Sequence, residues 1–194
     1  MSAASPSTAR KPSARERLLT AADELFYAEG IHTVGIDRII ERAGVAKASL
    51  YSTFGSKDEL VRAYLEGRHG LRRGRLLKGL ERFEDPRERV LGVFDVLDEL
   101  AGSPDFRGCP FYNASAEGVP GGPVQEVSDS SRAWTRGLFV ELAREAGAKD
   151  PAAFAAQMVV LYDGASVGAR MDRPAMAPKV ARAMAETLLD AALA

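Results

Sequence analysis

The sequence of 194 residues predicts an all-α protein of about nine helices. Apolar residues recur at helical spacing along most of the chain. The pairs Asp85-Pro86 and Asp150-Pro151 each place an N-cap residue and an N1 proline ahead of an apolar run. No segment shows the sustained alternation of apolar and polar residues that is typical of a β-strand. We therefore expect helices throughout, with no repeat at a fixed period.

The N-terminal region predicts an arm followed by two helices. Residues 1–12 lack periodic apolar residues and predict a disordered basic arm. A first helix should follow Ser13, which forms a capping-box pattern with Glu16, and should end in a left-handed stop at Gly30. A second helix is expected from about 36 to 43.

A third, short helix is expected in the segment AGVAKASLYSTFGSKDEL, residues 43–60, after the break at Gly44. Its large inward anchors are Val45, Leu50 and Phe54, and most of its other residues are small or polar. The remaining predicted elements are a capped helix from Ser56 to about Leu80, helices beginning at Pro86 and Pro151, a short helix near 109–117, a break at 118–123, a helix over about 124–146 and a last helix over about 178–194.

Composition narrows the class of protein. With 46% hydrophobic and 27% charged residues, the chain is typical of globular proteins. It lacks an uninterrupted apolar run of membrane-spanning length and the apolar centre of a signal peptide, so we expect no membrane segment and a cytoplasmic location. One cysteine cannot form an internal disulfide, and two histidines without ligand spacing predict neither a metal nor another cofactor.

Charge is distributed unevenly along the chain. The first 75 residues hold 13 Lys and Arg against 9 Asp and Glu, a balance of +4, and the remainder holds 13 against 18, a balance of -5. A polyanionic partner should therefore meet the N-terminal third of the chain.

Two short helices joined by a tight glycine turn predict a helix-turn-helix. A recognition helix that enters a major groove about 12 Å wide needs small residues where its backbone approaches the DNA. Hydrogen-bond donors and small side chains then remain on the outward side of the third helix, where they can contact DNA. Lys57 lies beside the start of the fourth helix, where a cation and free amides would hold a phosphate. The outward donors are Lys47, Ser49, Tyr51, Ser52 and Thr53.

Residues 33–61, TVGIDRIIERAGVAKASLYSTFGSKDELV, resemble the DNA-binding domain of the TetR-like (TetR/AcrR) bacterial transcriptional regulators. The first predicted helix, RERLLTAADELFYAEG, fits the same family, so the resemblance covers about residues 13–62. Its pattern G-V-x-x-x-x-L-Y-x-x-F-x-x-K is more specific than a lone short motif. The resemblance implies a DNA-binding domain over 13–62 and a helical ligand-binding and dimerisation domain over 63–194.

The resemblance also implies roles for individual residues. Lys47, Ala48 and Ser49 are expected over base edges, and two subunits are expected to present their third helices to a palindromic operator. Many relatives have His at the position of Thr53, which weakens the expectation for that residue. The expected contacts to the DNA backbone are Thr33, Tyr51, Thr53 and Lys57, with Ser52 added from the outward side of the helix.

Simpler interpretations exist for these residues. Tyr51 could pack in the core, and Lys57 could be an ordinary solvated lysine. Arg10 and Lys11 could contact a minor groove or only improve solubility.

In the second domain, the segment FRGCPFYNASAEG, residues 106–118, resembles one found in ligand-binding domains of the family. The aromatic and methionine residues there are core residues by default, but some could line a cavity for a small, largely apolar effector. Cys109 could sense electrophiles, although a buried, inert thiol is the commoner case. His32 and His69 are expected in turns or at the surface. The cavity candidates are Phe94, Cys109, Phe111, Tyr112, Trp134, Met158 and Tyr162.

Small residues are frequent in the last two predicted helices, from Ala152 to Ala169 and from Ala181 to Ala192. They allow close helix packing, and the resemblance implies a homodimer in which these helices form a four-helix bundle. Plain alanine-rich composition is the alternative.

The sequence therefore predicts a homodimeric, ligand-responsive repressor, with the fourth helix as the hinge between DNA and effector. An activator, or a DNA-binding protein without an effector, is the alternative. A helical enzyme is disfavoured, because the chain shows no Ser-His-acid order, no paired carboxylates with a reason to be perturbed and no phosphate-binding glycine loop.

Overall fold

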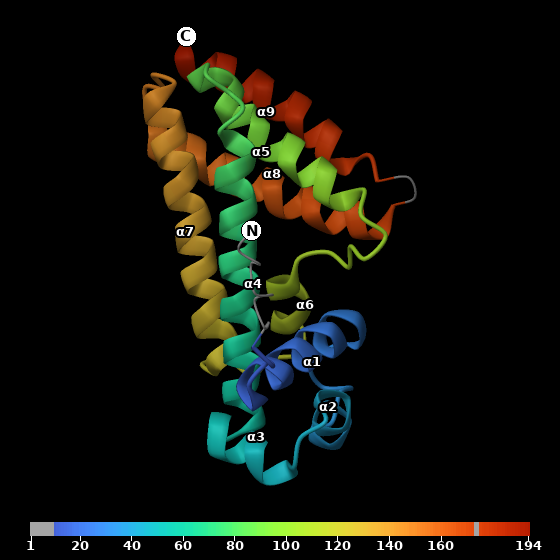
Figure 1. Cartoon of the computed structure of the whole chain (residues 1–194). Helices are drawn as coiled ribbons and strands as arrows, with labels where there is room; N and C mark the ends of the chain where they lie inside the picture. The colour runs from blue at the N-terminus through green and yellow to red at the C-terminus, as the bar shows by residue number, and fades with distance from the viewer. Residues whose placement is uncertain (1–9, 173–174) are drawn as a thin grey trace, which may run out of the picture. The chain divides into compact units, whose positions relative to one another are not determined.

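A computed structural model describes residues 10–172 and 175–194, and within them the chain is all-helical without a strand (Figure 1). The prediction of about nine helices is confirmed. The predicted arm lies mostly outside the described residues, although Arg10 and Lys11 are exposed and non-helical. The helices are α1 (Ala14–Glu29), α2 (Ile36–Ala43), α3 (Lys47–Phe54), α4 (Lys57–Leu80), α5 (Pro86–Ala101), α6 (Pro110–Ser115), α7 (Pro123–Glu145), α8 (Pro151–Met171) and α9 (Ala177–Leu193).

Local capping explains where several helices begin. At α1, Ser13 Oγ accepts a hydrogen bond from the Glu16 amide at 3.2 Å, and the Glu16 carboxylate accepts one from the Ser13 amide at 2.6 Å. These reciprocal bonds satisfy two amides that the helix itself leaves unpaired. Asp85 and Asp150 cap α5 and α8 through amides in their first turns, and a proline follows each of them. Gly30 ends α1 at φ 94° and ψ 156°, a positive φ outside the predicted left-handed helical region.

The chain divides into two compact units, Met1–Tyr64 and Leu65–Ala194. In the first unit, α1, α2 and α3 pack around a small core in which the rings of Phe26 and Tyr64 meet edge to face at 5.5 Å. Amphipathic helices of this length depend on such packing for their stability. The core includes Leu18, Ala22, Phe26, Ile39, Leu50, Leu60, Val61 and Tyr64.

The core of the second unit lies between α5, α7, α8 and α9 (Figure 1). Three rings meet at its centre, with centroids 6.1 Å apart for Phe94 and Phe139 and 6.4 Å apart for Phe94 and Tyr162. Helices α8 and α9 approach so closely at Gly168 that a Cβ there would lie 2.6 Å from the Cβ of Ala177. Small residues of α8 and α9 therefore serve packing within one chain.

One described helix, α8, is long and apolar enough by length and composition to cross a membrane. Core helices of soluble proteins meet the same criterion. Here α8 contributes Phe154, Met158 and Tyr162 to the core, and it carries the charged residues Asp163 and Arg170. These features are typical of a core helix.

Candidate nucleic-acid interface and cavity

A tight glycine turn joins α2 to α3. Gly44 has φ 61° and ψ 44°, the left-handed conformation that glycine adopts without a Cβ clash. Its amide bonds to the last carbonyls of α2, and the amide of Val45 donates to Ile40 O at 3.1 Å. These bonds close the end of α2 and fix the direction in which the chain enters α3.

Helix α3 is held to the unit by its predicted anchors. Leu50 is fully buried, and Val45 and Phe54 are half-buried. The guanidinium of Arg15, in α1, lies 5.6 Å from the centroid of the Phe54 ring. Because Leu50, Val45 and Phe54 hold one side of α3 against the unit, its opposite face remains available to a partner.

Most of the residues predicted to contact DNA lie on that outward face. Tyr51 is 45% exposed and does not pack in the core. Ser49 is half-buried, and Thr33 is exposed in the turn before α2. The other exposed candidates on α3 are Lys47, Ala48, Ser52 and Thr53.

Two of these side chains bond to the backbone of α3 itself. Thr53 Oγ1 donates to Ser49 O at 2.6 Å, and Ser52 Oγ donates to the same carbonyl at 3.2 Å. Each hydroxyl has one proton, so either side chain must leave this carbonyl before it can donate to a phosphate.

Lys47 forms an ion pair at the outward surface. Its Nζ lies 3.0 Å from Asp37 Oδ1, and the hydrogen bond and charge of Asp37 raise the pKa of Lys47. Both side chains are largely exposed, and such pairs contribute little stability. Lys47 can therefore exchange Asp37 for a nucleic acid at small cost.

Lys57 is the first residue of α4, and its ammonium lies 6.0 Å from the centroid of the Phe26 ring. Within the described residues it has no ion pair. Ser56 Oγ accepts a hydrogen bond from the Glu59 amide at 3.1 Å, which caps the same helix end. A cation at a helix N-terminus is a favourable place for a phosphate.

The arginines that join α1 to α2 are neutralised by carboxylates. Arg38 donates to both carboxylate oxygens of Glu29, at 2.6 and 2.9 Å, and Arg42 binds Glu24 at 2.7 Å. The hydrogen bond from Arg38 lowers the pKa of Glu29.

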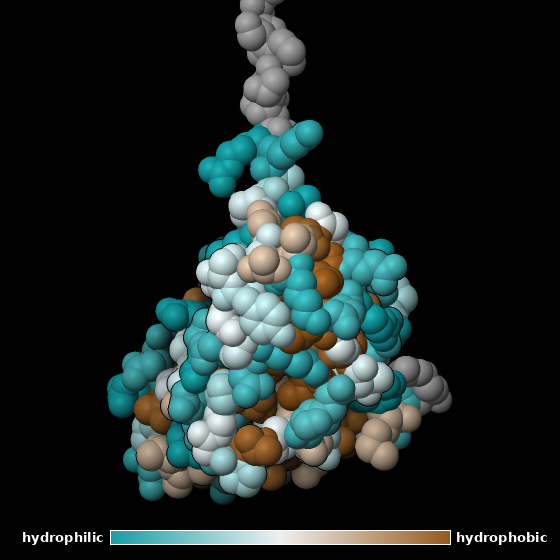
Figure 2. All heavy atoms as spheres, turned by 90° about the horizontal axis from the view of Figure 1, so that it is seen from below, coloured by the Kyte–Doolittle hydropathy of each residue, from teal (hydrophilic) through white to brown (hydrophobic). Residues whose placement is uncertain are grey.

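The space-filling view shows a mostly hydrophilic or neutral face with separate hydrophobic patches (Figure 2).

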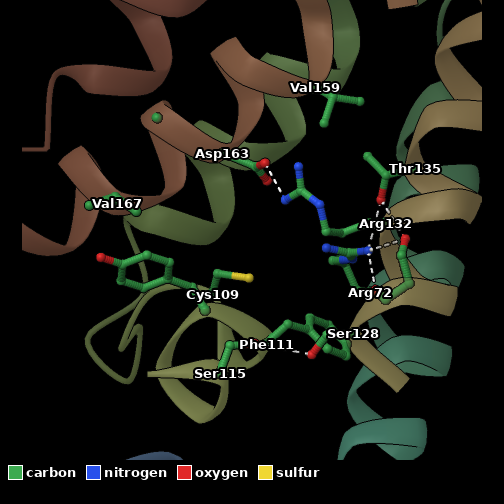
Figure 3. A pocket seen from close by; sticks show the side chains of 13 residues that line it. Arg72, Cys109, Phe111, Ser115, Ser128, Arg132, Thr135, Val159, Asp163 and Val167 are labelled. Atoms are coloured by element: carbon green, nitrogen blue, oxygen red, sulfur yellow. Dashed lines mark hydrogen bonds and ion pairs between the residues drawn. The ribbon is translucent and has the colours of Figure 1, made fainter. Parts of the chain in front are cut away.

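The second unit contains a cavity of about 550 Å³, a volume typical of small-molecule sites. Four helices supply its walls, and the side chains project into a common space (Figure 3). The lining residues are Arg72 from α4; Cys109, Phe111, Tyr112 and Ser115 at α6; Ser128, Ser131, Arg132 and Thr135 from α7; and Val159, Asp163, Gly164 and Val167 from α8.

The cavity brings together some of the predicted candidates and not others. Cys109, Phe111 and Tyr112 line it. Phe94, Met158 and Tyr162 do not line it but lie in the core, and burial raises the pKa of Tyr162 to about 12. Trp134 is half-buried against the same core, outside the lining. Helical spacing marks Phe94, Met158 and Tyr162 as inward, but it does not tell core from cavity.

Polar residues outside the predicted candidates form one wall. Ser128, Ser131 and Thr135 are buried at spacings of three and four residues on α7, so they share one helix face. The detectable signal was a stripe of small polar residues on the face that carries Phe139 and Leu142 further along the helix.

Arg72 is bound to this wall. Its Nη2 donates to Ser131 Oγ at 2.7 Å and to Thr135 Oγ1 at 2.9 Å. Its guanidinium carbon lies 5.0 Å from the centroid of the Phe111 ring. Two hydroxyls and one ring therefore fix the orientation of the cation.

His69 lies in α4 and is half-buried, so it is not in a turn, the first of its two expected places. Its Nδ1 is 3.2 Å from Ser131 Oγ, and its ring meets those of Phe111 and Trp134 edge to face at 6.4 and 5.6 Å. Burial, followed by the charges of Arg72 and Arg73, lowers the pKa of His69. The imidazole fits here because the neutral ring packs well between two aromatic side chains.

Arg132, also on α7, places its Nη1 2.5 Å from Asp163 Oδ2, and this ion pair joins α7 to α8. No group of three or more His, Cys, Asp or Glu in the described part of the chain could hold a metal.

Helices α8 and α9 carry small residues of two kinds. Some of them, such as Ala165 and Ala185, are buried within the chain. Others flank large apolar side chains that face outward, with Val160 70% exposed. The other exposed apolar side chains of α8, α9 and the residue before α9 are Met171, Met176, Val180 and Met184.

Comparison with known proteins identifies the family. The family model described as "Bacterial regulatory proteins, tetR family" matches residues 18–64. The structure of SCO4454, a TetR-family transcriptional regulator from Streptomyces coelicolor, is 35% identical, with a TM-score of 0.87 over 93% of this chain and 96% of that chain. The HTH-type transcriptional regulator LmrA of Bacillus subtilis is 28% identical over 150 residues, which are 75% of this chain and 79% of LmrA. The HTH-type transcriptional activator FasR of Mycolicibacterium smegmatis is 50% identical over 52 residues, 27% of this chain and 24% of FasR. Both the sequence of the first unit and the fold of nearly the whole chain therefore agree, and the protein belongs to the TetR family of helix-turn-helix, DNA-binding transcriptional regulators.

Proposed function

We propose that this protein is a cytoplasmic, homodimeric repressor that leaves a palindromic operator when a small molecule enters the second unit. The outward face of α3 supports this proposal most directly. Lys47, Ala48 and Ser49 are at the start of a helix whose opposite side is anchored by Leu50. Side chains at the start of a recognition helix are those that meet base edges in helix-turn-helix proteins.

Contacts to the DNA backbone would position α3 in the groove. Tyr51, Ser52 and Thr53 follow on the outward side of α3, with Thr33 in the preceding turn and Lys57 at the start of α4. Such contacts supply affinity and orientation but carry no sequence information directly.

Helix α4 would couple the effector to DNA. Lys57 is its first residue, and Arg72, about four turns further along, lines the cavity. An effector that shifts α4 would change the spacing of two recognition helices. The ligand needs only to favour one spacing by a few kcal/mol.

The exposed apolar face of α8 and α9 would form the dimer interface. Val160, Val180 and Met184 are each at least half exposed. Helices α8 and α9 pack against each other, and exposed apolar side chains on such neighbouring helices are candidates for an interaction site. A two-fold interface would let one protein meet two operator half-sites.

An activator is the second candidate, since the relative FasR is described as an activator. Activation and repression can share one DNA-binding surface, so the outward face of α3 does not distinguish them. Enzymatic activity is disfavoured because the relatives are transcriptional regulators. Turnover of a bound effector would contradict this view.

A binding assay on the DNA upstream of the protein's own gene tests the proposal. Lys57→Ala and Tyr51→Phe should weaken binding to all sequences, and Lys57→Ala should reduce the slope of log affinity against log salt by about 1. Ser49→Ala should instead relax the base preference. Lys78→Ala, an exposed lysine in the last turn of α4, is the matched control and should change neither. If all three site variants bind DNA as the unaltered protein does, the assignment of these residues to DNA contact is wrong.

A further inference from the structure

The guanidinium of Arg72 is incompletely satisfied. Its Nε is shielded from solvent and has no hydrogen-bond partner among the described residues. Its Nη2 binds only hydroxyl and carbonyl oxygens of Ser131 and Thr135, and no carboxylate pairs with it in the described part of the chain. Removing a cation from water is costly unless an opposite charge compensates for it.

The cavity as a whole carries an excess of positive charge. Of its charged lining residues, Arg132 and Asp163 pair with each other, and Arg72 is left without a counter-charge. His69 behind the wall adds none near neutral pH, because its pKa is lowered. The cavity is therefore electrostatically suited to one anionic group.

Arg72 is also held in position before any ligand arrives. Ser131 and Thr135 fix one nitrogen of the guanidinium, and the guanidinium carbon lies 5.0 Å from the centroid of the Phe111 ring. A planar guanidinium held in this way matches the geometry of a carboxylate, and its side-chain entropy is already lost. Dashed lines in Figure 3 mark the hydrogen bonds between Arg72 and the hydroxyls of this wall.

The rest of the cavity suits an apolar body. Tyr112, Val159 and Val167 line it together with Phe111. We infer that the effector is an amphipathic carboxylate whose anionic group binds Arg72 and whose apolar part lies on these side chains. This inference depends on the proposed effector site and names the class of ligand that the site takes.

Matched probes test the inference on the full chain by titration calorimetry. The probes are octanoate, octanamide and octylamine, and phenylbutanoate, phenylbutanamide and phenylbutylamine. Within each series the carboxylate should bind at least about tenfold more tightly than the amide, because a charge-assisted bond to the guanidinium is lost in the amide. The amine should bind most weakly, since it brings a second positive charge.

Arg72→Gln should remove the preference for carboxylate over amide, whereas Arg72→Lys should retain part of it through its point charge. Arg75→Gln is the control, because Arg75 is an exposed arginine on the same helix outside the cavity lining. Circular dichroism and melting temperature establish that each variant folds. If Arg72→Gln does not fold, the comparison of probes on the unaltered protein decides.

Amides or amines that bind as tightly as the carboxylates would overturn the inference. A folded Arg72→Gln variant that keeps the preference would do the same, as would no binding of any probe. DNA binding without ligand, measured in parallel, separates this inference from the proposed function. A protein that binds operator DNA but shows no carboxylate preference keeps the regulator proposal and loses the anionic effector.

Discussion

Lys47 Nζ, in the first turn of α3, lies 3.0 Å from Asp37 Oδ1, in the first turn of α2. The ion pair places a carboxylate beside a residue predicted to meet base edges. Asp37→Asn should therefore raise affinity for duplex DNA by up to about fivefold at low salt, because it frees Lys47 and removes a charge that repels phosphates. Fluorescence anisotropy with labelled operator DNA measures the change. Asp105→Asn, in the second unit, is the control, and equal effects of the two substitutions would contradict a local role for Asp37.

Leu50 anchors α3, and its side chain is fully buried. Leu50→Ala should destabilise the first unit by about 2 to 4 kcal/mol, through lost burial and the cavity that it leaves. Urea unfolding followed by circular dichroism measures the change. Leu71→Ala, at a leucine that is 55% exposed, should cost less than about 1 kcal/mol. A small loss at Leu50 would mean that α3 is anchored elsewhere.

His69 predicts a pH dependence of stability. Its pKa is lower in the folded protein than its ordinary value of 6.5, so the unfolded chain binds the proton more readily. The associated stability is fully present above about pH 6.5 and is lost as the pH falls below that value. Melting temperatures at about pH 7.5 and about pH 5.5 should therefore differ less in His69→Asn than in the unaltered protein. A His69→Asn variant whose melting temperatures at the two pH values differ as much as those of the unaltered protein would contradict this role of His69.

Val160, on α8, is 70% exposed within an apolar surface that we propose as the dimer interface. Val160→Glu should shift the protein from dimer to monomer at micromolar concentration, because it places a charge in an apolar contact. Light scattering after size-exclusion chromatography measures the mass. Val119→Glu, at a valine that is 69% exposed outside α8 and α9, should leave the mass unchanged. A Val160→Glu variant that remains dimeric would place the interface elsewhere.

The boundaries of the helices were determined by local signals in the sequence. Ser13 with Glu16, Gly44 and the Asp-Pro pairs act through hydrogen bonds and dihedral preferences within a few residues, so each could be recognised from its neighbours alone. The helix-turn-helix was predictable for the same reason. Its three helices are short and close in sequence, and its anchors follow from helical spacing.

The cavity was decided by tertiary structure. Helical spacing predicts that Phe94, Met158 and Tyr162 face the interior. They do, but they pack in the core and do not line the cavity. The walls instead include Arg72 and Thr135, from helices about sixty residues apart in sequence. Which inward side chains meet a cavity depends on how four helices are rotated and spaced against one another. That arrangement is set by the packing of the whole unit, because no single helix pattern contains it.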